Sequence, residues 1–184
     1  MKILIINGPN LNLLGTREPE IYGNVSMEDF LNTLKADCNQ HQIDFFQSNV
    51  EGELINRIQK DDFDALVINP GAYTHYSYAI ADCLKNISKP KIEVHISNIY
   101  KREEFRQKSV TAANTDAVLS GFGLNGYRLA IINLVEEYDK EWFLLPFNKN
   151  NMRNILALIA FAALVSCKKD VEPIVQISKE NPQS

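Results

Sequence analysis

The feature that most constrains the fold of this chain is a regular alternation of short apolar runs with segments of helical spacing. Five apolar runs are predicted to be strands: residues 2–7, 43–48, 65–69, 91–96 and 117–120. The first is followed by Gly8-Pro9 and the third by Pro70-Gly71. Continuous apolar runs that end at such turn residues are typical of strands buried on both faces of a sheet.

The segments between these runs carry apolar residues three and four positions apart, which predicts helices over residues 26–42, 51–60, 76–88, 102–108 and 124–138. Ser26 stands before the first of them, with Asp29 three residues on, in a shortened variant of the capping box. Single helices between strands require crossover connections, which are right-handed in nearly all proteins. We therefore predict an α/β fold, a three-layer doubly wound parallel five-stranded sheet with helices on both faces.

Composition narrows the function classes. The 184 residues are 45% hydrophobic, enough for one good core. The net charge of −4, with both signs interspersed, argues against nucleic acid as a partner. Cys38, Cys83 and Cys167 are odd in number and lack metal-ligand spacing, which favours a reducing compartment, and the first apolar run is too short for a secretory signal. We expect a cytoplasmic protein.

Polar side chains gather directly after three of the predicted strands. In open parallel sheets, ligands bind beyond the carboxyl ends of the strands, so these loops are the expected site. The residues concerned are Asn10, Arg17 and Tyr22 after the first strand, Asn69, Tyr73 and His75 after the third, and His95, Ser97 and Asn98 after the fourth. Taken singly, Arg17 and Tyr22 are more often surface loop residues, His75 a helix cap, His95 a hydrogen-bonded histidine at a strand end, and Asn10 and Asn69 turn formers. Their occurrence together is what favours a site.

Several common site chemistries lack motif support. The loop GPNLNLLG after the first strand lacks the GxGxxG spacing of a dinucleotide fold and the GxxxxGK[ST] spacing of a phosphate-binding loop, which argues against nucleotide binding there. The chain has no GxSxG elbow, which argues against a serine hydrolase. The histidines at 41, 75 and 95 do not form HExxH or any compact ligand set, so no metal site is predicted.

Four stretches in order carry a resemblance to a known family: GPNLNLLGTREPEIYG, INPGAYTHYSYAIAD, EVHISNIYKREEFRQKS and SGFGLNGYRLAI. Over residues 1–145 the chain resembles type II 3-dehydroquinase. The resemblance implies a flavodoxin-like domain that assembles into a homododecamer made up of trimers. It also implies a lyase of the shikimate pathway of aromatic amino acid biosynthesis, which dehydrates 3-dehydroquinate to 3-dehydroshikimate by anti elimination through an enolate, with no metal or cofactor.

The resemblance assigns catalytic roles to four residues. Tyr22 matches the proton acceptor, and because a phenol has an ordinary pKa near 10, a cation is needed to favour its ionised form. Arg17 is the residue placed to supply it and to stabilise the transition state. Asn10 matches the amide that positions a water against the enolate oxygen, and His95 matches the proton donor to the leaving hydroxyl.

The resemblance also implies which residues hold the substrate: Asn69, His75, Asp82, Ile96, Ser97 and Arg106. Ile96 and Ser97 would act partly through backbone amides, Arg106 suits a carboxylate, and Asp82 is expected to come from a neighbouring subunit. Arg102, by contrast, is interpreted with the two glutamates after it as an ordinary solvated helix start.

The resemblance does not extend over the last part of the chain. We therefore predict a catalytic domain over residues 1–148 and an atypical C-terminal extension over residues 149–184. The apolar run 155–165 is too short to span a bilayer but suits a signal-peptide core. It ends in Leu-Val-Ser-Cys at Cys167, which resembles a lipoprotein signal stranded inside the chain. One hypothesis is a fused or misread reading frame, and the other is a helix that covers an oligomer surface or contacts a membrane.

Two rival functions remain open at this point. The chain could be a non-catalytic scaffold that kept the fold, or a lyase or isomerase acting on a related cyclic polyol ketone. Neither rival has a sequence feature of its own.

Overall fold

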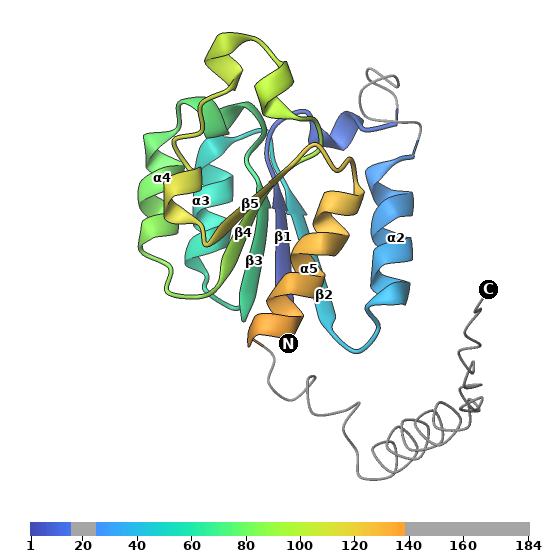
Figure 1. Cartoon of the computed structure of the whole chain (residues 1–184). Coiled ribbons are helices and arrows are strands. Elements are labelled where there is room, and N and C mark those ends of the chain that lie inside the picture. Colours follow the sequence, from blue (N-terminus) through green and yellow to red (C-terminus); the bar gives the residue numbers. More distant parts are fainter. Residues whose placement is uncertain (16–24, 139–184) are drawn as a thin grey trace, which may run out of the picture. The chain divides into compact units, whose positions relative to one another are not determined.

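Five parallel strands form one sheet in the order β2-β1-β3-β4-β5 in the computed structural model, which describes residues 1–15 and 25–138 (Figure 1). The strands are β1 (Lys2–Asn7), β2 (Gln42–Gln47), β3 (Ala65–Asn69), β4 (Lys91–His95) and β5 (Ala117–Ser120). The pairs are all parallel, as in Ile3 with Ile43 and with Ala65. The predicted five-stranded sheet is confirmed, with strand bounds that differ by at most one residue.

Two helices of the described part cover each face of the sheet, which gives three layers (Figure 1). They are α2 (Met27–Asp37) and α5 (Asn125–Tyr138) on one face, and α3 (Glu51–Gln59) and α4 (Tyr78–Lys85) on the other. Strand β1 shows why both faces are filled. Its Ile3 and Ile5 pack with α2 and α5, while Leu4 and Ile6 pack with α3 and α4, because successive side chains of a strand point to opposite faces.

Helix α2 begins where the capping pattern predicts. The Ser26 hydroxyl oxygen accepts a hydrogen bond from the Asp29 amide at 3.0 Å. The hydroxyl proton is donated to the Asp29 carboxylate at 2.7 Å. Ser26 thus satisfies one of the free amides of the first turn, and Asp29 adds a negative charge where the helix dipole favours it.

Three predicted helices differ from the structure. The first, predicted to end at 42, ends at Asp37. The helix predicted over 76–88 is shorter in the structure: α4 ends at Lys85 and begins only at Tyr78, because the Ser77 hydroxyl caps it through the Ile80 amide at 2.9 Å. A separate 3-10 helix, Gly71–His75, precedes it. The helix predicted over 102–108 is wrong. A short 3-10 helix, Glu104–Arg106, stands there instead, and another, Ile99–Lys101, precedes it. The segment has no apolar stripe to bury, because its one large apolar side chain, Phe105, is exposed.

The loops that leave β1 and β3 touch each other through a glycine. The Gly8 amide donates to the Asn69 carbonyl at 2.8 Å. A Cβ atom at Gly8 would overlap the Pro70 carbonyl oxygen, so only a glycine fits there. The backbones of the two loops are therefore in direct contact, and this contact fixes the spacing between them.

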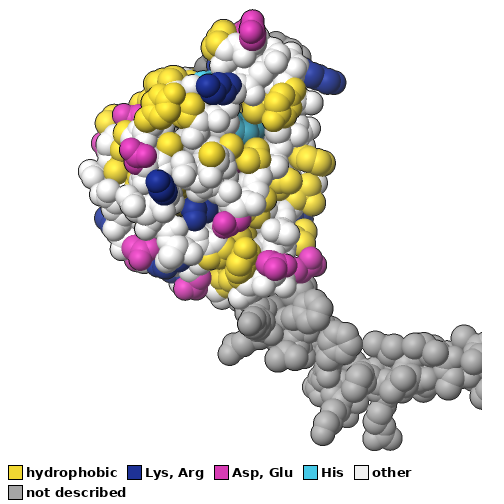
Figure 2. Space-filling model, turned by 60° about the vertical axis from the view of Figure 1, so that its left-hand side comes forward, with side chains coloured by type: hydrophobic (Ala, Val, Ile, Leu, Met, Phe, Trp, Pro, Cys, Tyr) yellow, Lys and Arg dark blue, Asp and Glu magenta, His cyan; other side chains and the backbone are white. Residues whose placement is uncertain are grey.

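The surface of the described part has two plain features. On the face in Figure 2, Lys and Arg side chains stand singly among Asp and Glu, with hydrophobic side chains gathered between them. Among residues 1–15 and 25–138, no helix is both long and apolar enough to cross a membrane.

We expect Gly8→Ala to lower the free energy of unfolding by about 2 kcal/mol or more, because the added methyl group meets backbone atoms that cannot rotate away. Gly52→Ala is the matched control. Gly52 lies in α3, and no described atom lies within 4 Å of the place that a methyl group would take, so alanine there should be neutral or stabilising by up to about 1 kcal/mol. Urea unfolding followed by circular dichroism checks both, and equal effects of the two substitutions would contradict the contact described.

Candidate active site

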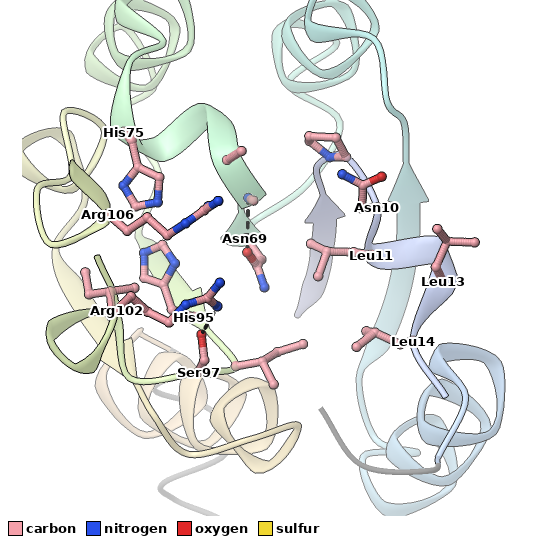
Figure 3. A pocket seen from close by; sticks show the side chains of 15 residues that line it. Asn10, Leu11, Leu13, Leu14, Asn69, His75, His95, Ser97, Arg102 and Arg106 are labelled. Carbon is pink, nitrogen blue, oxygen red and sulfur yellow. Dashed lines mark hydrogen bonds between the residues drawn. The ribbon is translucent and has the colours of Figure 1, made fainter. Parts of the chain in front are cut away.

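A cavity of about 180 Å³ opens at the carboxyl ends of β1, β3 and β4 (Figure 3). The cavity lies beside β1, which has β2 on one side and β3 on the other, so the order in which the chain adds strands to the sheet reverses there. Such a reversal of strand order is the position at which doubly wound sheets leave a crevice for ligands. A cavity therefore lies at the edge of the sheet where the sequence predicts a site.

Seven of the ten predicted site residues line this cavity: Asn10, Asn69, His75, His95, Ile96, Ser97 and Arg106. Asp82 does not line it and is exposed on α4. Arg17 and Tyr22 lie outside the described residues, as does the extension 149–184. The structure therefore brings the described loops together as expected, while the roles of the residues stay predictions.

Asn10 stands at the rim of the cavity in a left-handed backbone conformation, with φ of 66°. Asparagine tolerates this conformation better than most residues. Its backbone amide donates to Oδ1 of Asn49 at 3.0 Å, and its side chain is exposed. The backbone turn thus presents the Asn10 carboxamide to solvent beside the cavity (Figure 3).

Asn69 is buried at the end of β3, and its carboxamide is held at both ends. Oδ1 accepts from the Gly71 amide at 3.1 Å, and Nδ2 donates to the Tyr127 hydroxyl at 2.9 Å (Figure 3). Asn69 therefore shapes the turn after β3 and also lines the cavity.

His95 is the last residue of β4 and is 6% exposed. Its Nε2 lies 2.6 Å from Oε1 of Glu93, two residues earlier on the same face of the strand. An ionised carboxylate only accepts hydrogen bonds, so Nε2 carries the proton of this pair. The other ring nitrogen, Nδ1, is left for a ligand.

Glu93 is fully buried and is surrounded by hydroxyl groups. Oε1 accepts from Thr74 at 2.8 Å and from Ser109 at 3.0 Å, and Oε2 accepts from Thr111 at 2.5 Å. Burial raises the pKa of the Glu93 carboxyl, but the hydrogen bonds from His95, Thr111 and Thr74 and the charge of His95 outweigh it, so the pKa lies below its ordinary value. Glu93 is thus ionised and fixed behind His95.

Sequence reasoning missed this carboxylate, although a signal was present. A glutamate in the middle of the apolar run Lys91–His95 has to find partners when the strand is buried on both faces. Its position two residues before His95 places both side chains on one face of the strand. The hydroxyl residues that satisfy it lie in other segments of the chain.

Basic side chains line another wall of the cavity. Arg106 and Arg102 reach it from the two 3-10 helices after β4, and His75 reaches it from the 3-10 helix after β3 (Figure 3). The interpretation of Arg102 as a solvated helix start is therefore wrong: Nη1 lies 3.4 Å from Oγ of Ser97. That interpretation rested on a helix that the segment does not form.

The positions of these basic groups are set by local contacts. Nε of Arg106 lies 3.1 Å from a carboxylate oxygen of Glu103, and its guanidinium carbon is 4.8 Å from the centre of the Phe105 ring. Nδ1 of His75 lies 2.8 Å from the Lys108 carbonyl, which only accepts, so Nδ1 carries a proton.

The cavity therefore combines two guanidinium groups, two histidines and two carboxamides. Guanidinium groups bind carboxylates by paired hydrogen bonds, and histidine transfers protons near neutral pH. Within residues 1–15 and 25–138, no group of three or more His, Cys, Asp and Glu side chains is placed to hold a metal ion. The arrangement suits a small anionic, hydroxylated ligand and a proton-transfer reaction.

We expect Glu93→Gln to lower the free energy of unfolding by about 2–4 kcal/mol at neutral pH, because the amide turns one acceptor into a donor among groups that all donate. Since the pKa of Glu93 is lower in the folded protein than its ordinary value of 4.5, its stabilising effect is complete above about that pH and is lost as the pH falls through the folded value. The gap in stability between wild type and variant should therefore narrow below pH 4.5.

Urea unfolding at a series of pH values measures this gap. Glu137→Gln, which removes an exposed carboxylate on α5, is the control and should leave stability within about 0.5 kcal/mol at every pH. A Glu93→Gln protein as stable as wild type at neutral pH would contradict the buried ionised carboxylate.

Comparisons with known proteins agree with this geometry. The sequence model of the family described as Dehydroquinase class II matches residues 1–135. A 3-dehydroquinate dehydratase from Thermotoga petrophila is 55% identical over 133 residues, which cover 71% of this chain and 92% of the relative. One from Caldicellulosiruptor bescii is 54% identical over 143 residues, which cover 75% of this chain and 99% of the relative.

Solved structures give the same result. The crystal structure of type II dehydroquinase from Butyrivibrio crossotus superposes with a TM-score of 0.71 at 51% identity, covering 73% of this chain and 97% of that one. The flavodoxin-like fold expected from the sequence is confirmed by this match and by the strand order 2-1-3-4-5. Family model, relatives and fold agree, and the chain belongs to the family of class II dehydroquinases.

Proposed function

We propose that this chain is a hydro-lyase that dehydrates 3-dehydroquinate to 3-dehydroshikimate, in the shikimate pathway of aromatic amino acid biosynthesis. One observation carries the proposal. In a member of the class II dehydroquinase family, the loops after β1, β3 and β4 converge on one cavity that holds proton-transferring and carboxylate-binding side chains. The substrate is a small cyclic ketone with a carboxylate and hydroxyl groups, which is the class of ligand that this cavity suits.

The reaction needs a base, a stabiliser for an enolate and an acid. The base removes a proton from the carbon next to the ketone, and the electrons of that C–H bond form the enolate. The enolate then expels the β-hydroxyl group, which leaves as water after it receives a proton from the acid. The product is a conjugated enone. The enzyme returns to its starting state when the base releases the proton it took and the acid regains the proton it gave.

We assign the role of base to Tyr22. Arg17 would stabilise the ionised phenol and the transition state. Asn10 would hold the water that faces the enolate oxygen. Two facts support this. Asn10 stands at the rim of the cavity, and Leu14, three residues before Arg17, lines it.

We assign the proton donor to His95. Because its Nε2 proton is held against Glu93, the proton for the leaving hydroxyl comes from Nδ1. The Glu93 carboxylate balances the positive charge that the ring carries while both nitrogens are protonated. Glu93 is thus a positioning residue, which acts on the substrate only through His95.

The substrate carboxylate would bind between the 3-10 helices after β3 and β4. Arg106 supplies the guanidinium group, and the Ile96 and Ser97 backbone and His75 complete the polar wall. Arg102 adds a second positive charge to the same cavity. Among the residues that the structure describes, the cavity lining holds two guanidinium groups and no carboxylate, which favours an anionic ligand over a neutral one.

We also propose that the enzyme is a homododecamer made up of trimers. In this assembly Asp82 completes the site of a neighbouring subunit. Asp82 and Tyr78 lie four residues apart on the exposed face of α4, outside the cavity of their own chain. Large apolar side chains are exposed on and around this helix and the 3-10 helices, namely Tyr76, Tyr78, Tyr100 and Phe105. An exposed apolar surface of this kind is typical of a subunit interface.

Two further assignments are part of the proposal. Cys38 and Cys83 are free thiols, which supports a reducing, cytoplasmic setting. The family model ends at residue 135 and the Caldicellulosiruptor bescii relative is matched almost entirely over 143 residues, which supports a catalytic domain of 1–148 with 149–184 as a separate extension.

The activity is tested by the ultraviolet absorbance of the enone when the full chain meets 3-dehydroquinate. We expect Tyr22→Phe and His95→Gln each to lower kcat by about 100-fold or more, because each removes a group that moves a proton in the reaction. Tyr138→Phe, an exposed tyrosine on α5, is the matched control and should keep wild-type kcat. A chelator should change nothing.

The outcomes separate the rival functions. No turnover by a folded wild type would favour a non-catalytic scaffold, and turnover of another cyclic ketone alone would favour a different lyase. Full activity in Tyr22→Phe would show that another group is the base.

The intersubunit role of Asp82 is tested by co-expressing two inactive variants, Asp82→Ala and His95→Gln, with different tags. In mixed oligomers a native site forms wherever a subunit with His95 meets a neighbour with Asp82, so about a quarter of wild-type activity should return after random assembly. Each variant alone should stay inactive. If mixed oligomers also stay inactive, Asp82 does not act across the interface.

A further inference from the structure

A buried polar chain lies beneath the floor of the cavity, on the side of α5. Tyr127 of α5 is fully buried, and its hydroxyl sits between two carboxamides. It donates to Oδ1 of Asn7 at 2.8 Å and accepts from Nδ2 of Asn69 at 2.9 Å. The three side chains come from the end of β1, the end of β3 and the first turns of α5, and of the three only Asn69 lines the cavity.

The chain of hydrogen bonds has a fixed direction. Asn7 directs Nδ2 to Sδ of Met27 at 3.7 Å, so its Oδ1 faces Tyr127 and requires a donor. The Tyr127 hydroxyl has one proton, which is committed to Asn7, and can only accept from Asn69. Burial raises the pKa of Tyr127, with the hydrogen bonds to Asn69 and Asn7 only partly offsetting it, so the hydroxyl keeps this proton throughout the physiological range.

The other end of the Asn69 carboxamide is also occupied. Oδ1 accepts from the Gly71 amide at 3.1 Å. If the carboxamide turned by half a rotation, its oxygen would face a hydroxyl lone pair and its NH₂ group would face an amide donor. Both contacts would be lost inside a buried site, at a cost of about 1–3 kcal/mol for each unsatisfied group.

Packing alone does not require the Tyr127 hydroxyl. The ring packs against Phe30 at a centroid distance of 5.8 Å and belongs to the apolar core between α2 and α5. A phenylalanine would fill the same space without needing a polar partner. The buried hydroxyl and the buried Asn7 amide therefore serve the one member of the chain that reaches the cavity.

We infer that Tyr127 and Asn7 are positioning residues for substrate binding: they hold the Asn69 carboxamide in one orientation, in which its second Nδ2 hydrogen is presented as a donor to a substrate oxygen. The inference rests on the proposed function, in which Asn69 contacts the substrate. It adds two residues outside the cavity to the determinants of affinity.

The first test compares Tyr127→Phe with Ile131→Val in the full chain, using 3-dehydroquinate. Ile131 lies on the same helix in the same core but holds no polar group. Tyr127→Phe should raise KM about tenfold and change kcat less than threefold, since one hydrogen bond that orients a binding group is lost. Ile131→Val should change neither, although it also removes stability. Unchanged KM in Tyr127→Phe would overturn the inference.

The second test asks whether the hydroxyl acts through Asn69. In an Asn69→Ala background, Tyr127→Phe should change KM less than twofold, because the group that it orients is gone. A tenfold rise that persists in this background would overturn the inference. Asn7→Ala serves as a second single variant and should raise KM in the same direction, since Tyr127 can then turn its proton toward Asn69.

The third test does not depend on activity. A crystal structure of Tyr127→Phe should show Asn69 in a second side-chain conformation, or without its hydrogen bond to Gly71. An unchanged, fully occupied Asn69 would overturn the inference even if the wild type failed to act on 3-dehydroquinate. Failure of the proposed function is recognised separately, by absence of turnover in the wild type.

Discussion

The candidate active site depends on one buried negative charge. An ionised carboxylate in the interior costs several kcal/mol unless it is well partnered, and Glu93 accepts from His95 and from three hydroxyl groups. The hydroxyls belong to the 3-10 helix after β3 and to the segment before β5, far apart in the sequence. These two segments must close around β4 for the charge to be stable, and the Glu93 that they hold in turn holds the ring of His95. The cavity wall and the histidine are thus fixed by the same interaction.

A second set of polar contacts supports the cavity from the opposite layer. The Glu93 cluster lies on the face of the sheet covered by α3 and α4, since Ile92 and Val94, which alternate with it, pack toward α2 and α5. Tyr127 and its two asparagines lie on the α2 and α5 face. Each helical layer therefore contains one buried group that holds one cavity residue: Glu93 holds His95, and Tyr127 holds Asn69. A substitution that disturbs one layer would alter the site through His95, and one that disturbs the other would alter it through Asn69.

Much of the fold follows from the sequence because it depends on local patterns. Buried strands appear as apolar runs, Ser26 marks the start of α2, and right-handed crossovers leave few topologies for five β/α repeats. The position of the site follows as well, since polar loop residues after neighbouring strands must meet at one edge of the sheet.

What could not be predicted depends on partners distant in sequence. Glu93 can lie buried behind the site only because the hydroxyl groups of Thr74, Ser109 and Thr111 donate to it. Arg102 lines the cavity because its segment forms 3-10 helices and not a continuous helix. Tyr127 lies in the helix predicted over 124–138, and its link to Asn69 spans 58 residues, so no local pattern indicates it. Helix ends and irregular segments are set by such contacts rather than by local propensity.

The contact between Gly8 and Pro70 has a consequence for how this site can diverge. With two backbones in contact at that point, neither loop can change length or gain a side chain there unless the other moves as well. The wall formed by Ile99–Lys101 and Glu104–Arg106 is different, because most of its side chains are exposed and its backbone is not held in the same way. Related enzymes that come to accept other ligands should therefore do so by changing this wall, while the loops after β1 and β3 stay the same in length and shape.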